Sequence, residues 1–239
     1  MQEEIIQKVS RRFHRAIAEY NLIEDGDKIL VGLSGGKDSL CLLELLAKKM
    51  KISHPHFHVE AIHVRMENIS YESDTSYLQS FAKRLDVPLH IVTTRFDTEK
   101  DKRKPACFLC SWNRRKQLFN FAQEHHFNKI AFGHHMDDIL HTALMNQFFQ
   151  GHFATMPVKL KMRKMPITII RPLCLEIEDE IRQYAQLKEY QGQKKICPYE
   201  RETHRSSIRN IFEGVERMNP EARYSLWNAL ESEGKLIEV

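Results

Sequence analysis

The chain has 239 residues, a formal net charge of +4 and 42% hydrophobic residues, which suits one α/β domain with a small appendage. No run of about 18 apolar residues is present, which argues against a membrane span. The charged N-terminus lacks the apolar centre of a secretory signal. Five cysteines without framework spacing favour a reducing compartment. We therefore expect a cytoplasmic protein.

Helical and strand patterns alternate through the first two thirds of the chain. Residues 3–20 place apolar side chains at helical spacing with basic residues between them, which predicts an N-terminal helix with a basic face. Strands are predicted at 29–32, 57–64, 89–93 and 129–132, and helices at 40–51, 71–85, 110–126 and 138–150. This alternation predicts a mainly parallel sheet with crossover helices, the doubly wound Rossmann-like α/β fold.

The pattern changes after Gly151. Residues 158–162 and 167–170 predict an antiparallel strand pair, and helices are expected at 176–188, 203–217 and 220–233. We therefore expect three parts: a basic N-terminal helix over 1–27, a nucleotide-binding domain over 28–173 and a helical C-terminal segment over 174–239.

The first strand leads into Ser34-Gly35-Gly36-Lys37-Asp38-Ser39. The two glycines let the backbone approach a ligand, and the helix that follows adds partial positive charge to that of the lysine. The aspartate makes chemical sense beside an anion if a divalent cation lies between them. The string is neither the common P-loop nor a dinucleotide fingerprint. An ordinary glycine turn is the alternative, and the polar side chains around the glycines argue against it.

Two later turns follow predicted parallel strands and therefore open on the same sheet edge as the glycine loop. The turn at 133–138 reads Gly-His-His-Met-Asp-Asp. Its carboxylates could hold Mg²⁺ or serve with the imidazoles in proton transfer, and we favour a nucleotide or Mg²⁺ role for Asp137. The alternative is a turn in which an aspartate, Asp138 included, only caps the next helix.

The other turn carries Cys107 and Cys110 at the entry to a helix. This spacing is shared by redox dithiols, half zinc sites and cluster ligands. Cys197 is the third candidate, since three thiolates on a four-coordinate metal leave one position open for a substrate atom. Alternatively, Cys197 packs alone. Cys41 and Cys174 have apolar neighbours and are expected in the core.

Basic residues gather in five stretches of the chain. Solvated faces would explain any one of them, but five beside a nucleotide loop suggest a polyanionic substrate. The candidate RNA contacts are Arg11, Arg12, Arg114, Arg115, Lys159, Arg205 and Arg209.

The glycine loop resembles the PP-loop of the N-type ATP pyrophosphatases, which implies that ATP is split between its α and β phosphates. Across residues 5 to 212 the chain resembles the tRNA 2-thiocytidine synthetases, PP-loop sulfurtransferases that act on the anticodon loop. The matching stretches are 23–29, 34–39, 107–111 with Arg114 and Arg115, 133–140, Met156 and Pro157 with Lys159 and Leu160, and 171–173. The chain departs from the family's pattern at Glu200, where a further cysteine is often found. It also departs at the end of strand two, which is often acidic and here reads His63-Val64-Arg65.

The resemblance implies ATP and Mg²⁺ as cofactors, a [4Fe–4S] cluster on Cys107, Cys110 and Cys197, tRNA as substrate and a cysteine desulfurase as sulfur donor. It also implies catalytic roles for Lys37, Asp38 and Asp137, with Asp38 holding Mg²⁺. The implied nucleotide contacts are Ser34, Gly35, Gly36, Lys37, Asp38, Ser39, His63, Gly133 and His134.

Two alternatives remain open. The chain could adenylylate another tRNA base or a small molecule, or it could be a nucleotide- and RNA-binding protein whose C-x-x-C pair holds structural zinc. The sequence does not decide between a monomer and a homodimer.

Overall fold

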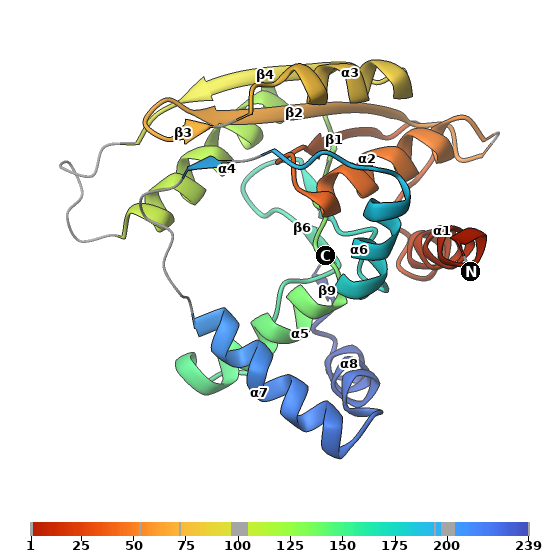
Figure 1. Ribbon diagram of the computed structural model, residues 1–239, viewed down its shortest axis with the longest axis vertical. Coiled ribbons are helices and arrows are strands. Elements are labelled where there is room, and N and C mark those ends of the chain that lie inside the picture. Colours follow the sequence, from red (N-terminus) through yellow and green to blue (C-terminus); the bar gives the residue numbers. More distant parts are fainter. Residues whose placement is uncertain are drawn as a thin grey trace.

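The computed structural model describes residues 2–52, 54–71, 73–96, 105–193, 195–196 and 204–238. Within these residues the main sheet has seven strands in the order β4-β2-β1-β5-β7-β6-β9 (Figure 1). Its parallel part consists of β4 (Leu89–Thr94), β2 (His58–Met66), β1 (Lys28–Gly32), β5 (Lys129–Ala131) and β7 (Thr168–Ile170). β6 (Lys159–Lys161) runs antiparallel to β7, and β9 (Ile237–Glu238) pairs with β6. The predicted doubly wound, mainly parallel sheet is confirmed.

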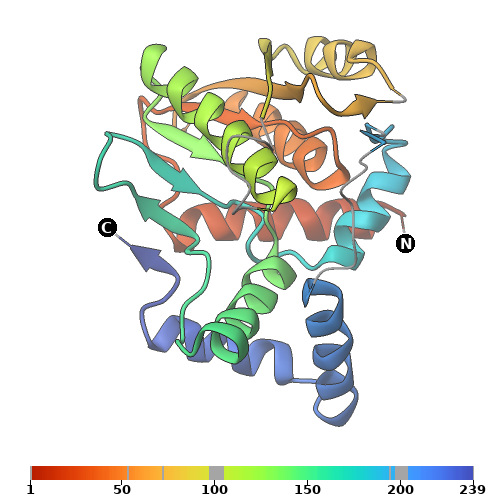
Figure 2. The same ribbon diagram turned by 90° about the vertical axis from the view of Figure 1, so that its left-hand side faces the viewer.

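Helices cover both faces of this sheet. On β1, Ile29 and Val31 point into one core, and Leu30 points into the other, as the alternation of a strand requires. In Figure 2, α4 (Ala106–Glu124) lies in front of the sheet and α1 (Gln2–Glu19) behind it. The core on the α1 side also takes in α2 (Lys37–Met50), α3 (Ser76–Leu85) and α6 (Glu178–Leu187).

The C-terminal part packs on α5 (Met136–Met145), the helix that follows β5. α7 (His204–Met218) and α8 (Ala222–Ser232) lie beside α5 at the far end of the molecule from β4 (Figure 1). The rings of His141 on α5 and Phe212 on α7 meet edge to face, with centroids 5.9 Å apart. Among the described helices, none is long and apolar enough to cross a bilayer.

Several predicted boundaries were wrong. The helix expected at 110–126 begins at Ala106, directly after Pro105, whose extended ψ of 145° makes it the N-cap outside the helix. The helix expected at 71–85 begins at Ser76, since β3 (Ser70–Tyr71) pairs with β8 (Lys195–Ile196). The helix expected at 138–150 begins at Met136 and continues as a π-helix, η1 (Asn146–Gln150).

Candidate functional site

The glycine loop connects β1 to α2 at the carboxyl edge of the sheet. Gly35 has φ +86°, a conformation that side chains rarely adopt. The Ser34 hydroxyl accepts a hydrogen bond from the Gly36 amide at 3.3 Å and lies 3.1 Å from the Ser39 hydroxyl. The loop is therefore closed on itself and faces the sheet edge with hydroxyl groups and the N-terminus of α2.

The turn after β5 presses against this loop. A Cβ atom added to Gly133 would lie 2.9 Å from the backbone carbonyl carbon of Asp38 and 3.0 Å from the amide nitrogen of Ser39. Backbone atoms cannot move aside cheaply, so the contact requires glycine. It fixes the position of the Gly-His-His turn relative to α2.

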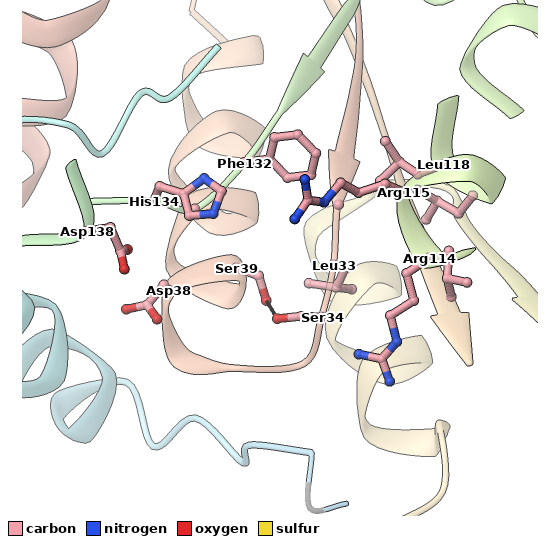
Figure 3. A pocket seen from close by; sticks show the side chains of 14 residues that line it. Leu33, Ser34, Asp38, Ser39, Arg114, Arg115, Leu118, Phe132, His134 and Asp138 are labelled. Carbon is pink, nitrogen blue, oxygen red and sulfur yellow. Dashed lines mark hydrogen bonds between the residues drawn. The ribbon is translucent and has the colours of Figure 1, made fainter. Parts of the chain in front are cut away.

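A pocket of about 340 Å³ opens between the glycine loop, the turn after β5 and α4. We call it the nucleotide pocket. One part of its lining is apolar, with Ile62, Val64, Leu118 and Phe132. The other part carries hydroxyl, imidazole and carboxylate groups, from Ser34, Asp38, Ser39, His134 and Asp138 (Figure 3). Arg114 and Arg115 of α4 complete the wall. The pocket thus offers an apolar slot for a base next to a polar end for phosphates and a cation.

Two carboxylates converge at the polar end. His135 Nε2 lies 3.5 Å from Asp138 Oδ2 and 4.0 Å from Asp38 Oδ1. Asp38 Oδ1 is buried and lies 3.2 Å from Lys37 Nζ, and it accepts no hydrogen bond from the described residues. Mg²⁺ is commonly held by one or two carboxylates together with substrate phosphates. The donor set therefore fits a magnesium–nucleotide complex.

Asp137, for which the sequence favoured a nucleotide or Mg²⁺ role, does not line the pocket. Its Oδ1 lies 2.5 Å from Arg223 Nη1 on α8, and its Oδ2 accepts the backbone amide of Glu178 at 2.7 Å. Burial raises the pKa of Asp137, but the bond from His135 and the charge of Arg223 outweigh it and hold that pKa well below its usual range. The neighbouring Asp138 lines the pocket and also accepts the His135 amide at the start of α5.

Lys37 is held by carboxylates. Its Nζ lies 3.2 Å from Glu178 Oε1 and 3.3 Å from Asp38 Oδ2. The other oxygen of Glu178 pairs with Arg209 of α7. Burial lowers the pKa of Lys37, but the two carboxylates raise it by more than burial lowers it. The pKa therefore lies above its ordinary value, and the ammonium group stays charged. No sequence pattern pointed to Glu178, which joins Lys37 and Arg209 in one charged cluster.

The predicted nucleotide contacts divide into two groups. Ser34, Asp38, Ser39, Gly133 and His134 line the nucleotide pocket; Gly35, Gly36, Lys37 and His63 do not. His134 Nδ1 accepts a hydrogen bond from Arg171 Nε at 3.2 Å, a contact that sequence reasoning missed. His63 is buried and bonds the Leu33 carbonyl through Nδ1 at 2.7 Å.

The C-x-x-C pair occupies the first turns of α4, the helix that also lines the nucleotide pocket. Cys107 is exposed and Cys110 is half-buried, and Arg114 follows Cys110 by one helical turn. Cys197, the third predicted ligand, lies outside the described residues. Cys41 and Cys174 are fully buried, as predicted, and burial raises the pKa of both thiols.

The predicted RNA contacts have varied surroundings. Arg11 is exposed on α1. Arg12 instead pairs with Glu180 of α6, and Lys159 donates to the Asn21 carbonyl at 2.7 Å, so both make internal contacts. Arg114 and Arg115 line the nucleotide pocket. The side chain of Arg205 lies outside the described residues.

Residues 5–229 match the PP-loop domain family. A tRNA-cytidine(32) 2-sulfurtransferase of Francisella tularensis subsp. tularensis is 35% identical over 95% of this chain and 86% of its own length. The tRNA-cytidine(32) 2-sulfurtransferase of Shewanella baltica is 34% identical over 95% of this chain and 76% of its own length. The U34-tRNA thiolase NcsA from Methanococcus maripaludis, solved with its [4Fe-4S] cluster, matches 97% of this chain and 79% of its own, with a TM-score of 0.79 and 26% identity. The chain therefore belongs to the PP-loop family of tRNA-cytidine(32) 2-sulfurtransferases.

Proposed function

We propose that this protein is an ATP-dependent tRNA sulfurtransferase that replaces the C2 oxygen of a cytidine in the anticodon loop by sulfur. One observation carries the proposal: α4 presents Cys107 and Cys110 on its first turns and lines the nucleotide pocket with its next residues, Arg114 and Arg115. A nucleotide-activating pocket and a pair of thiols thus share one helix. Membership of the tRNA-cytidine(32) 2-sulfurtransferase family supports tRNA as the substrate.

The reaction divides into two balanced steps. The cytidine O2 attacks the α-phosphorus of ATP and pyrophosphate leaves, and a sulfur nucleophile then attacks C2 and AMP leaves with the former O2. The Ser34 and Ser39 hydroxyls and the N-terminus of α2 would bind phosphate oxygens, and Arg114 and Arg115 would offset the charge that develops on them. Asp38 and Asp138 would hold Mg²⁺, which supplies charge compensation on the phosphates.

Asp138 replaces Asp137 in this scheme because it lines the pocket, whereas Asp137 is bound to Arg223 and the Glu178 amide. Lys37 would reach the phosphates by leaving Glu178, whose second partner, Arg209, stays with it. The catalytic groups proposed for this chain are therefore Asp38, Asp138 and Lys37.

The cysteines fit an iron–sulfur cluster by donor type, since thiolates are the usual cluster ligands. Cys107 and Cys110 would supply two ligands, and Cys197 is proposed as the third. When bound, the cluster supplies an iron that can carry the sulfur to be transferred.

A cysteine desulfurase as sulfur donor, a cytoplasmic location and a homodimer belong to the same proposal. So does the division into a basic helix over 1–27, a PP-loop domain over 28–173 and a C-terminal segment over 174–239, although β9 returns to the main sheet.

Anaerobic purification and reconstitution test the proposal against a zinc-stabilised RNA-binding protein. We expect about four irons per chain with broad thiolate-to-iron absorbance, and pyrophosphate release that requires both ATP and tRNA. Tightly bound zinc without iron, together with no pyrophosphate release, would contradict the enzyme and favour the zinc-stabilised RNA-binding protein. Pyrophosphate release with a small molecule but not with tRNA would favour the other enzyme hypothesis.

A further inference from the structure

A second cavity adjoins the nucleotide pocket at the PP-loop. It has a volume of about 190 Å³ and is lined by Ser34, Gly36, His63, Tyr71, Arg114 and Gln193. Ser34 and Arg114 line both cavities. On β2, His63 stands between Ile62 and Val64, which line the nucleotide pocket, so its side chain points to the opposite face of the sheet. Two cavities therefore meet at one phosphate-binding loop.

Three polar atoms around this second cavity have unmet hydrogen-bonding capacity. Within the described part of the chain, His63 Nε2, Arg114 Nε and Gln193 Oε1 are buried without a hydrogen-bond partner. His63 itself is 3% exposed. Each such atom costs about 1–3 kcal/mol when it is left unpaired. In a cavity of this size, either ordered water or a bound group can complete these bonds.

The other hydrogen bonds of these side chains determine whether each unpaired atom is a donor or an acceptor. His63 Nδ1 lies 2.7 Å from the Leu33 carbonyl, which only accepts, so Nδ1 carries the proton and Nε2 is an acceptor. Burial lowers the pKa of His63, which keeps the ring neutral. Gln193 Nε2 donates to the Asp74 carbonyl at 3.3 Å, so Oε1 remains as an acceptor. Arg114 Nε can only donate.

The missing group must therefore offer N–H or O–H donors to two acceptors and accept from a guanidinium. An unprotonated phosphate has no donor and does not fit. The Watson–Crick edge of cytosine carries the N4 amino group, a double donor, beside the acceptors N3 and O2. Uracil places a carbonyl oxygen where cytosine has its amino group.

We propose that this cavity, the base recess, holds the acceptor cytosine by its Watson–Crick edge. His63 and Gln193 accept from the amino group, and Arg114 donates to the ring. The inference rests on the proposed function and adds the residues that select the base. The backbone N–H of Gln193 donates to the Gly35 carbonyl at 2.8 Å, so the recess is joined to the backbone of the PP-loop. A base held there presents its O2 beside the loop that binds the phosphates, as a base turned out of an RNA loop can.

The test compares two tRNA probes. One carries cytidine at position 32, and the other carries a pyrimidin-2-one nucleoside there, which has hydrogen in place of the amino group. The variants are His63→Asn, which can keep the bond to Leu33 but loses Nε2, and Gln193→Ala. Gln191→Ala is the matched control, because Gln191 lies on the same segment but does not line the recess. The readouts are kcat/KM for tRNA-dependent pyrophosphate release and the Kd for ATP measured without tRNA.

We expect the wild-type protein and Gln191→Ala to prefer cytidine by on the order of 100-fold, because the probe without the amino group leaves two buried acceptors, on His63 and Gln193, without their hydrogen bonds. In His63→Asn and in Gln193→Ala, activity on cytidine should fall by on the order of 10-fold and the preference for cytidine should shrink by the same factor, because each variant loses one of the two bonds, while the Kd for ATP stays within about two-fold. An unchanged preference in both variants would overturn the inference alone. A parallel rise in the Kd for ATP would assign the recess to ATP. No pyrophosphate release by the wild-type protein with tRNA would overturn the proposed function and the inference with it.

Discussion

Arg223 of α8 and Asp137 of α5 form a partly buried ion pair, with Nη1 and Oδ1 2.5 Å apart. The pair joins the C-terminal helices to the turn that carries the acidic end of the nucleotide pocket. The two adjacent aspartates of the turn therefore have different surroundings. Asp138 lines the nucleotide pocket, whereas Asp137 joins α5 to α8.

Substituting the two aspartates separately tests this division. Asp138→Asn should lower the kcat for pyrophosphate release by about 100-fold, the usual cost of removing one charge stabiliser. The melting temperature should change little, because the asparagine side-chain oxygen can still accept the hydrogen bond from the His135 amide. Asp137→Asn should instead destabilise the protein by about 2 kcal/mol, because it weakens the bond to Arg223. Urea unfolding and steady-state kinetics measure the two effects. The reverse pattern would return the magnesium role to Asp137.

Gly133→Ala should damage the site through the backbone. The added methyl group would meet the Asp38 carbonyl carbon at 2.9 Å, so the turn after β5 must move away from the PP-loop. We expect a loss of about 1–3 kcal/mol in unfolding free energy and a weaker Kd for ATP. Gly214→Ala in α7 is the control, since its Cβ would meet only the end of Arg217 at 3.6 Å. Equal ATP affinity in Gly133→Ala and the control would show that the contact does not shape the pocket.

Glu176 should make stability depend on pH. Burial raises its pKa to about 8, and neither carboxylate oxygen has a hydrogen-bond partner among the described residues. In the unfolded chain this carboxyl group has its ordinary pKa of 4.5. Between these two pKa values the folded state binds more protons, so this contribution to stability falls as the pH rises.

Glu176→Gln imitates the protonated form and should remove that slope. Near pH 4.5 the variant should have the same melting temperature as the wild-type protein, and above about pH 8 it should melt at a higher temperature. Thermal unfolding at a series of pH values measures both. Glu213→Gln, at an exposed position of α7, is the control. A slope that persists in Glu176→Gln would assign the pH dependence to other groups.

The cysteines should divide by function. Cys107→Ser and Cys110→Ser should each lower the iron content and stop sulfur transfer, while the Kd for ATP stays unchanged, because neither thiol lines the nucleotide pocket. Cys197→Ser should behave in the same way. Cys174→Ser should keep the iron and lose stability, because a buried thiol is replaced by a hydroxyl. Full sulfur transfer by Cys197→Ser would remove it from the ligand set.

Much of the fold could be predicted because periodicity and turn residues are local signals. The glycine loop and the polar turn after β5 each follow a predicted parallel strand. This pattern was enough to place both at the same edge of the sheet. The short strand β9 could not be predicted, since only its pairing with β6 distinguishes it from coil. Likewise, Arg12 looked like part of a solvent-facing basic stripe, but its partner Glu180 lies 168 residues away in the sequence.

The choice between Asp137 and Asp138 shows a finer limit. Both aspartates fall in the first turn of α5, which begins two residues before the predicted start at 138. Adjacent helical residues point about 100° apart, so the helix start decides which carboxylate faces the pocket. The pairing of Asp137 with Arg223, across 86 residues, completes the choice. A local sequence pattern contains neither piece of information.

Mass spectrometry of tRNA nucleosides from a strain that lacks this protein tests the central claim most directly. The strain should lose 2-thiocytidine, the wild-type gene should restore it, and a gene carrying Asp38→Ala should not, although the variant protein accumulates in folded form. Persistence of 2-thiocytidine in the deleted strain, or its restoration by Asp38→Ala, would contradict the account.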